Sequence, residues 1–138
     1  MERSLVLIKP DAMQRGLVGT IITRLERQGL KMVAIKMLHL DKALAQQLYA
    51  IHRDKPFFDD LVNYISSAPI IAIVFEGEKA VEVIRRTMGA TDPVKAEAGT
   101  IRGDFGQDIG RNSVHGSDSA ETAEKEVKLF FAESEICT

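Results

Sequence analysis

The sequence predicts an α/β protein in which helices pack on a sheet. Short apolar runs typical of buried strands alternate with segments whose apolar residues recur at helical spacing. The chain has 138 residues, of which 45% are hydrophobic and 28% are charged, the balance of a globular protein. We therefore expect a single domain over residues 1–138, with one core that needs no disulfide.

Three elements are expected in the first part of the chain. Residues 4–8, SLVLI, form a short apolar run that predicts a buried strand. A helix is expected over 16–29, with Gly29 as its stop. The apolar stripe of this helix consists of Val18, Ile21, Ile22 and Leu25. Residues 30–40 are rich in β-branched and apolar side chains and predict a second strand.

Two helices and a strand are expected next. Asp41 can cap a helix over 42–52, and Pro56 favours the start of another helix over 57–67. The stripes expected to face inward are Leu44, Leu48 and Ile51, then Phe58, Leu61, Val62 and Ile65. Residues 69–77, PIIAIVFEG, are almost continuously apolar and give the clearest strand prediction in the chain.

A helix over 78–89 precedes a long segment without a usable period. This segment, 90–111, is too long for an ordinary connection, and such loops are usually functional or disordered. Its arginines, Phe105 and Ile109 argue for an ordered loop, and its glycines permit tight backbone paths.

The chain ends in a brief strand and a helix. The strand is expected at 113–115, and the helix is expected over 120–131. Either Asp118 or Ser119 can cap this helix, and Asp118 with Glu121 has the spacing of a capping box.

Composition limits the functional classes. A net charge of −2 argues against a broad nucleic-acid surface but leaves room for a local phosphate site. The single cysteine, Cys137, excludes an intrachain disulfide and a Cys-based metal site. No apolar stretch has the length of a membrane span, and the N-terminal run is too short for a signal peptide. We expect a cytoplasmic protein without a membrane partner.

His115 is the residue whose setting raises a chemical question. It follows a predicted strand and precedes a helix start, where an anion is favoured. By itself it can be read as a metal ligand, a general base, a nucleophile or a structural polar residue, and for a lone histidine the structural role is the commonest. A zinc site is disfavoured, because His39 and His52 show neither HExxH spacing nor a shared helix face.

Several cationic side chains lie next to a predicted strand end or beside the long segment, where they could bind phosphate. Lys9 ends an apolar strand just before a proline, and arginine forks suit phosphate. The other cations beside the long segment are Arg85, Arg102 and Arg111. The chain contains neither a P-loop nor a GxGxxG motif, so side chains would have to hold any nucleotide phosphates.

Five separated motifs together resemble nucleoside diphosphate kinase. They are IKPDAMQRGLVG, DKPFF, TDP, GTIRGDF and GRNSVHGSDSAETAEKE, and the last is very similar to that family's active-site signature. The likeness runs from about residue 4 to residue 131, with no substitution at a position the family uses for catalysis. It implies a ferredoxin-like βαββαβ fold, with a four-stranded antiparallel sheet, a helical pair before the third strand and an ordered long loop.

The resemblance implies a ping-pong phosphotransferase with His115 as the nucleophile. This histidine would take the γ-phosphate of a nucleoside triphosphate, typically ATP, and pass it to a nucleoside diphosphate. Glu126 would orient the imidazole, Lys9 completes the catalytic set, and Ser117 belongs to the same network. The residues that match the family's phosphate contacts are Lys9, Tyr49, Arg85, Thr91 and Arg102.

The rest of the nucleotide site follows from the same resemblance. Phe57 and Ile109 match the pair that stacks on the base, which predicts low base specificity because stacking reads no base edge. Asn112, with Lys9, matches the ribose contacts. Mg²⁺ is the implied cofactor, held mainly by the phosphates, and Asp118 either reaches it through water or only caps the last helix. A homo-oligomer is implied, a hexamer rather than a tetramer.

Two rival classes are a nucleotide-binding homologue without catalysis and a small trimeric nucleotide sensor. Loss of catalysis would normally show at His115, Lys9 or Asn112, and all three are in place. A sensor has no need of a nucleophilic histidine with its glutamate. Exchange of the γ-phosphate separates these classes, because a sensor would bind ATP without exchanging it.

Overall fold

The computed structural model describes the whole chain, Met1–Thr138, around a four-stranded antiparallel sheet. The strand order is β2-β3-β1-β4, so β1 and β3 are central and β2 and β4 are edges. The strands are β1 (Glu2–Ile8), β2 (Lys31–Leu38), β3 (Ile70–Gly77) and β4 (Val114–Gly116). All four predicted strands are confirmed, and so is the ferredoxin-like arrangement.

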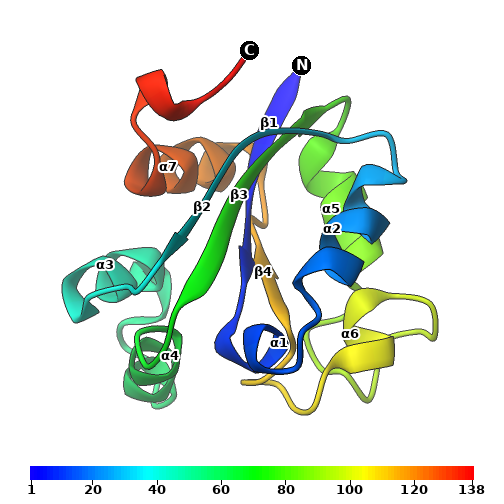
Figure 1. Cartoon of the computed structure of the whole chain (residues 1–138). Coiled ribbons are helices and arrows are strands. Elements are labelled where there is room, and N and C mark those ends of the chain that lie inside the picture. Colours follow the sequence, from blue (N-terminus) through cyan, green and yellow to red (C-terminus); the bar gives the residue numbers. More distant parts are fainter.

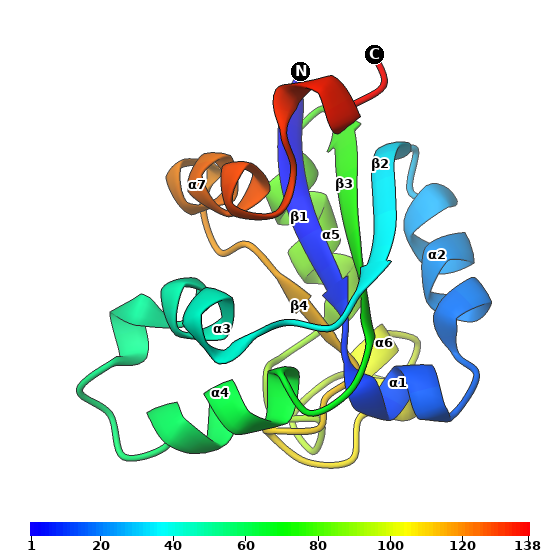
Figure 2. The same cartoon turned by 60° about the vertical axis from the view of Figure 1, so that its left-hand side comes forward.

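Helices cover both faces of this sheet (Figure 1). One face carries α1 (Pro10–Gln14), α2 (Val18–Glu26), α5 (Ala80–Met88) and α6 (Ile101–Phe105). The other carries α3 (Lys42–Leu48), α4 (Phe58–Ile65) and α7 (Ala120–Phe130), as the rotated view of Figure 2 also shows. Two single 3₁₀ turns, Ala50–His52 and Glu133–Glu135, complete the chain.

The sheet separates two hydrophobic layers. Along β1, Leu5 and Leu7 belong to the layer under α3, α4 and α7, while Val6 and Ile8 belong to the layer under α2 and α5. This alternation is the two-residue period of a strand with both faces covered. Strand β3 is buried on both faces in the same way, which explains its uninterrupted apolar run.

Several predicted boundaries need correction. The helix expected over 16–29 is shorter, and the separate helix α1 precedes it with Pro10 in its first turn. Ile51 was expected to face inward but is 73% exposed, because α3 ends at Leu48 and the chain tightens into a 3₁₀ turn. Helix α4 begins at Phe58 rather than directly after Pro56.

Helix caps decide two further points. The long segment 90–111 is ordered, as expected, but it contains α6, whose N-cap Thr100 accepts a hydrogen bond from the Gly103 N–H at 3.0 Å. The cap of α7 is Ser119, whose Oγ accepts from the Thr122 N–H at 3.1 Å. The capping box that Asp118 and Glu121 suggested is therefore wrong, and the Asp118 carboxylate is not used as a cap.

Candidate active site

The end of β1 meets the start of β4, and this junction joins residues that are far apart in sequence. Leu7 pairs with His115 in the sheet, and the Lys9 backbone N–H donates to the Ser113 carbonyl at 2.9 Å. The Lys9 side chain then donates from Nζ to Asn112 Oδ1 at 2.8 Å. The sheet thus brings Lys9, Asn112 and His115 to one place.

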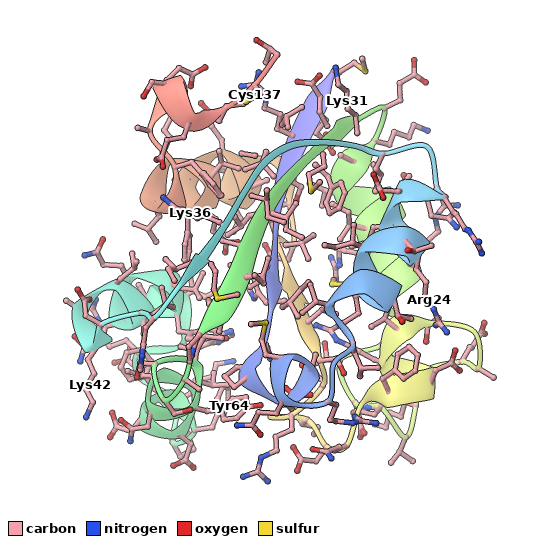
Figure 3. All side chains as sticks on the ribbon, viewed as in Figure 1. Arg24, Lys31, Lys36, Lys42, Tyr64 and Cys137 are labelled. Atoms are coloured by element: carbon pink, nitrogen blue, oxygen red, sulfur yellow. The ribbon has the colours of Figure 1, made fainter.

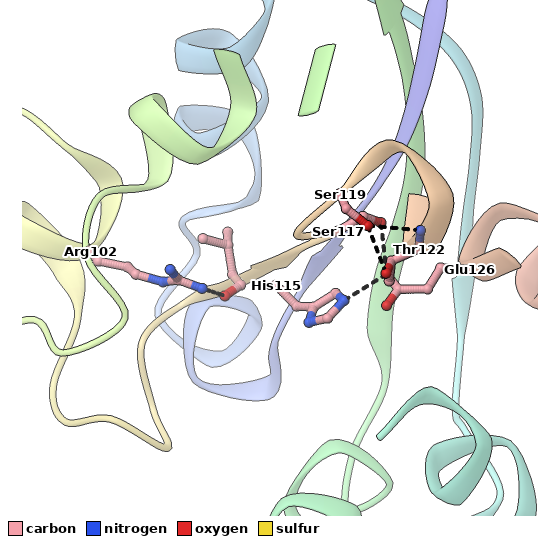
Figure 4. A network of polar contacts seen from close by, with 7 residues as sticks. Arg102, His115, Ser117, Ser119, Thr122 and Glu126 are labelled. Atoms are coloured by element: carbon pink, nitrogen blue, oxygen red, sulfur yellow. Dashed lines mark hydrogen bonds and ion pairs between the residues drawn. The ribbon is translucent and has the colours of Figure 1, made fainter. Parts of the chain in front are cut away.

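His115 is held by a carboxylate from α7 (Figure 4). Its Nε2 lies 2.9 Å from Glu126 Oε1, and the Ser117 hydroxyl donates to the same oxygen at 2.7 Å. An ionised carboxylate only accepts hydrogen bonds, so this contact assigns the ring proton to Nε2. Nδ1 then keeps a lone pair, and it is the nitrogen available for nucleophilic attack.

Tyr49, at the C-cap of α3, stands against the imidazole. The two ring centroids lie 6.1 Å apart and the planes meet at 89°, an edge-on contact that limits rotation of His115. Burial, reinforced by the charge of Glu126, raises the pKa of the Tyr49 phenol, which stays a hydrogen-bond donor at neutral pH.

Lys9 is buried, with 5% of its surface exposed. Burial first, and then the Arg102 charge, lower the pKa of its ammonium from 10.5 to about 8, with Asp11 partly offsetting both effects. An anion bound next to Lys9 would favour its charged form, so the site is arranged to gain from a phosphate.

The charge of Arg102 acts on this lysine, and the charge of Arg85 acts on Arg102. Arg102, on α6, donates to the carbonyls of Gly89 at 3.1 Å and Val114 at 2.8 Å. Burial first, and then the Arg85 charge, lower the pKa of Arg102 to about 10, so it remains charged at neutral pH. Arg85, on α5, donates to the Asp118 carbonyl at 3.1 Å. Like charges held this close have an energetic reason to bind a multiply charged anion between them.

Thr91 and Asn112 tie the long loop to this cluster. The Asn112 amide donates to the Thr91 carbonyl at 2.9 Å while its oxygen accepts from Lys9. A cavity of about 840 Å³ is lined in part by Arg85, Thr91 and Arg102. His115 is not among its lining residues, so this hollow opens on the cations from the α5 side rather than enclosing the imidazole.

Phe57 and Ile109, the expected base-stacking pair, come from separate segments. Phe57 is the N-cap of α4 and is 43% exposed, and Ile109 lies in the long loop and is 59% exposed. Large apolar side chains left this exposed are suited to contact a ligand. The structure gives Phe57 an aromatic neighbour, His52, with ring centroids 5.5 Å apart.

Arg111 does not join the other cations. Its guanidinium lies 5.8 Å from the ring centroid of Tyr64 and 3.9 Å from the Asp108 carboxylate. The sequence had grouped Arg111 with Lys9, Arg85 and Arg102 because all four flank punctuated segments. Only the fold separates it, since its side chain lies against Tyr64 and Asp108 while the next residue, Asn112, contacts Lys9.

The backbone conformation of Ser113 is a feature that the sequence did not reveal. Its φ is +77°, and the Val114 N–H donates to the Asn112 carbonyl at 3.0 Å across it, which makes a γ-turn of the rare, strained kind. The Ser113 hydroxyl is buried without a partner. A serine gives no local indication of a positive φ, because glycine is the residue expected there.

No three His, Cys, Asp or Glu side chains come together in a way that would hold a metal ion. None of the helices combines the length and the apolar character that crossing a membrane requires.

Comparison with known proteins places this geometry in a family. The sequence model described as NDK, nucleoside diphosphate kinase, matches residues 2–136. A nucleoside diphosphate kinase of Dehalococcoides mccartyi strain 195 is 60% identical over 99% of this chain and 96% of its own length. One from Archaeoglobus fulgidus is 57% identical over 99% of this chain and 90% of its own.

Solved structures agree with the sequences. The nucleoside diphosphate kinase of Halobacterium salinarum in complex with CDP superposes with a TM-score of 0.96 at 51% identity. That match covers 99% of this chain and 91% of the other. Fold and sequence therefore agree, and the chain belongs to the nucleoside diphosphate kinase family.

Proposed function

We propose that Nδ1 of His115 carries the phosphate that this enzyme moves from a nucleoside triphosphate to a nucleoside diphosphate. The observation that supports the proposal best is the hydrogen bond from Nε2 to Glu126, which leaves the Nδ1 lone pair free. In the first half-reaction, Nδ1 forms a bond to the γ-phosphorus. The bond from that phosphorus to the bridging oxygen breaks, and the diphosphate leaves with the electron pair.

The second half-reaction is the reverse with another diphosphate. Its terminal oxygen attacks the phosphorus, the nitrogen recovers its lone pair, and a new triphosphate leaves. Between the two steps the ring carries positive charge, which the Glu126 carboxylate stabilises from 2.9 Å away. The proton on Nε2 stays in place throughout, so the ring needs no tautomeric change.

The cationic side chains of the site stabilise the negative charge of the phosphates during transfer. Lys9, Arg85 and Arg102 surround the phosphates, with the hydroxyls of Tyr49 and Thr91 as further donors. Phosphoryl transfer depends mainly on in-line positioning and on charge stabilisation, and these cations and hydroxyls supply both. Burial first, and then a neighbouring positive charge, lower the pKa of Lys9 and of Arg102, and bound phosphates offset that charge repulsion.

The base contacts come from two exposed side chains and the ribose contacts from two buried ones. Phe57 and Ile109 stack on opposite faces of the base, while Asn112 and Lys9 contact the ribose hydroxyls. Stacking uses the π-face that every base has, so base specificity is low. The CDP complex of the Halobacterium relative supports a nucleotide in this fold.

Enzymes of this family use a divalent metal, and we propose Mg²⁺. The absence of a three-ligand side-chain cluster suits a cation held mainly by phosphate oxygens. Asp118 has an exposed carboxylate that is not used as a cap, which fits it for water-mediated contact. The metal would neutralise charge on the β- and γ-phosphates.

We also propose a homo-oligomer, a hexamer rather than a tetramer, that acts in the cytoplasm as a single-domain chain. Edge strand β2 exposes Ile35 to 46% and Met37 to 65%, and open edges favour pairing with another chain. The C-terminal segment covers only part of this edge, where the Cys137 N–H donates to the Val33 carbonyl at 2.7 Å. Light scattering in solution measures the number of subunits.

The reaction is tested by brief incubation with Mg²⁺ and γ-labelled ATP, followed by mapping of the bound phosphate. We expect an acid-labile label on His115 that GDP removes as GTP. A His115→Gly variant should bind ATP and stay unlabelled. If the unaltered enzyme binds ATP but takes no label, the chain is a nucleotide-binding homologue and the proposed mechanism is wrong.

A further inference from the structure

Tyr64 joins the last turn of α4 to the first turn of α1 (Figure 3). Its hydroxyl donates to Asp11 Oδ1 at 2.6 Å and accepts from the Asp11 backbone N–H at 2.8 Å. Asp11 is only 5% exposed, so water cannot easily replace either bond once it is lost. Burial and the bond to Asp11 raise the pKa of the Tyr64 phenol, which keeps its proton at physiological pH.

Polar groups gather at this junction. A cavity of about 620 Å³ lies along it, and most of the residues around it carry polar or charged side chains. Its lining consists of Asp11, Gln14, Arg15, Asn63, Tyr64, Ser67, Gln107 and Arg111. The two hydrogen bonds of Tyr64 therefore help to fix the position of the C-terminal end of α4 relative to α1.

The same tyrosine ring contacts the long loop. The Arg111 guanidinium lies 5.8 Å from its centroid, at the distance of a cation–π interaction. Residues 107–111 close on themselves, since the Gln107 N–H donates to the Arg111 carbonyl at 2.8 Å and the Arg111 N–H to Asp108 Oδ1 at 2.7 Å. Ile109 belongs to this hydrogen-bonded turn, so the position of its backbone is tied to that of Arg111.

Helix α4 connects Tyr64 to the other wall of the base site. Phe57, its N-cap, precedes Tyr64 by seven residues, which is about 10 Å along a helix axis. An α-helix this short moves as a rigid rod, so a small rotation at Tyr64 displaces Phe57. Tyr64 thus contacts the segments that carry Phe57, Ile109 and, through Asp11, the strand end at Lys9.

We infer that Tyr64 is a positioning residue that sets the spacing between Phe57 and Ile109, and thereby the affinity for the base of the nucleotide. The inference rests on the proposed function, which assigns the base to these two side chains. Tyr64 itself touches no reacting atom. Its contribution is to hold the segments that carry Phe57 and Ile109 in place before the nucleotide arrives, which lowers the ordering cost of binding.

The test compares a phosphate donor that carries a nucleobase with a phosphate donor that lacks one. Tyr64→Phe removes the hydroxyl and keeps the ring against Arg111. The measured quantity is the rate of His115 phosphorylation by ATP and by ribose 5-triphosphate, each as a function of donor concentration. We expect kcat/KM for ATP to fall about tenfold, mainly through KM, while the value for ribose 5-triphosphate stays unchanged.

Ser67→Ala is the matched control. The Ser67 hydroxyl donates to the Tyr64 carbonyl at 2.6 Å, so this variant removes a hydroxyl from the same end of α4 and leaves the bonds to Asp11 intact. Both donors should react with Ser67→Ala at native rates. Arg111→Gln, at an exposed position, tests the loop side independently and should lower kcat/KM for ATP about threefold, again without affecting ribose 5-triphosphate.

Each outcome distinguishes the inference from the proposed function. Equal losses with the two donors, or no loss with either, overturn the role of Tyr64. If Tyr64→Phe does not fold, the same comparison of kcat/KM for the two phosphate donors is made with Arg111→Gln. Phe57→Ala tests the base site directly, and equal effects of that variant on both donors would remove the base assignment itself. Failure of the unaltered enzyme to label His115 would instead refute the proposed reaction.

Discussion

Replacing Glu126 by glutamine removes one charge and almost nothing else. Glu126 is 8% exposed, and its Oε1 accepts from His115 Nε2 at 2.9 Å and from the Ser117 hydroxyl at 2.7 Å. Hydrogen bonds to a charged acceptor contribute about 1.5–3 kcal/mol, against about 1 kcal/mol for neutral ones. The amide can still accept both bonds, so Glu126→Gln should cost about 1–2 kcal/mol of the stabilisation that develops as the imidazole becomes positive.

At about 1.4 kcal/mol for each factor of ten, this cost corresponds to a fall of about 5- to 30-fold in the rate of His115 phosphorylation. The measurement is a single turnover with γ-labelled ATP in a quenched-flow instrument, where the label on the protein is followed directly. The affinity for ATP should hardly change, because Glu126 acts on the ring and not on the nucleotide. NMR of the phosphorylated enzyme should place the phosphate on Nδ1.

Two results would refute this reasoning. A native labelling rate in Glu126→Gln would mean that the carboxylate contributes no charge stabilisation. A phosphate on Nε2 would mean that the ring works in the other orientation. Ser117→Ala is the comparison variant, because it keeps the charge of Glu126 and deletes one hydrogen bond to it. Its labelling rate should fall less than that of Glu126→Gln.

Two further predictions concern the strand junction beside His115. Folded Lys9 releases its proton near pH 8 while the unfolded chain holds it up to 10.5, so the free energy of unfolding should rise with pH between these values. KM for ATP should rise over the same range, as Lys9 loses its charge, and urea titrations and kinetics of Lys9→Met should lack both trends. Ser113→Gly relieves a φ of +77° and deletes an unpartnered buried hydroxyl, so urea unfolding should show a gain of about 1 kcal/mol. Lys79→Gly is the control: Lys79 is exposed and has a φ of +52°, so this variant measures the effect of relieving a positive φ alone. A loss of stability in Ser113→Gly would show that the backbone at Ser113 is not strained.

Local patterns accounted for the elements that have strong local causes. Strand β3 could be read from its apolar run, and the start of α3 from Asp41, whose carboxylate accepts from the Leu44 N–H at 2.8 Å. Helices α1 and α6 were missed because five residues are too few to display a helical period. The choice between Asp118 and Ser119 as cap could not be made locally, since both residue types are good caps and lie next to each other.

The sequence by itself determined the family, the fold class and the set of residue types that phosphoryl transfer needs, because these depend on periodicity and on motifs in order. The tertiary structure alone decided how those residues act on one another. The contact of Lys9 with Asn112 spans 103 positions, and the bond of Tyr64 to Asp11 spans 53. The lowered pKa of Lys9 and the free Nδ1 of His115 likewise arise from neighbours in space. Burial, charge proximity and hydrogen-bond direction are properties of the folded arrangement, and no local stretch of sequence encodes them.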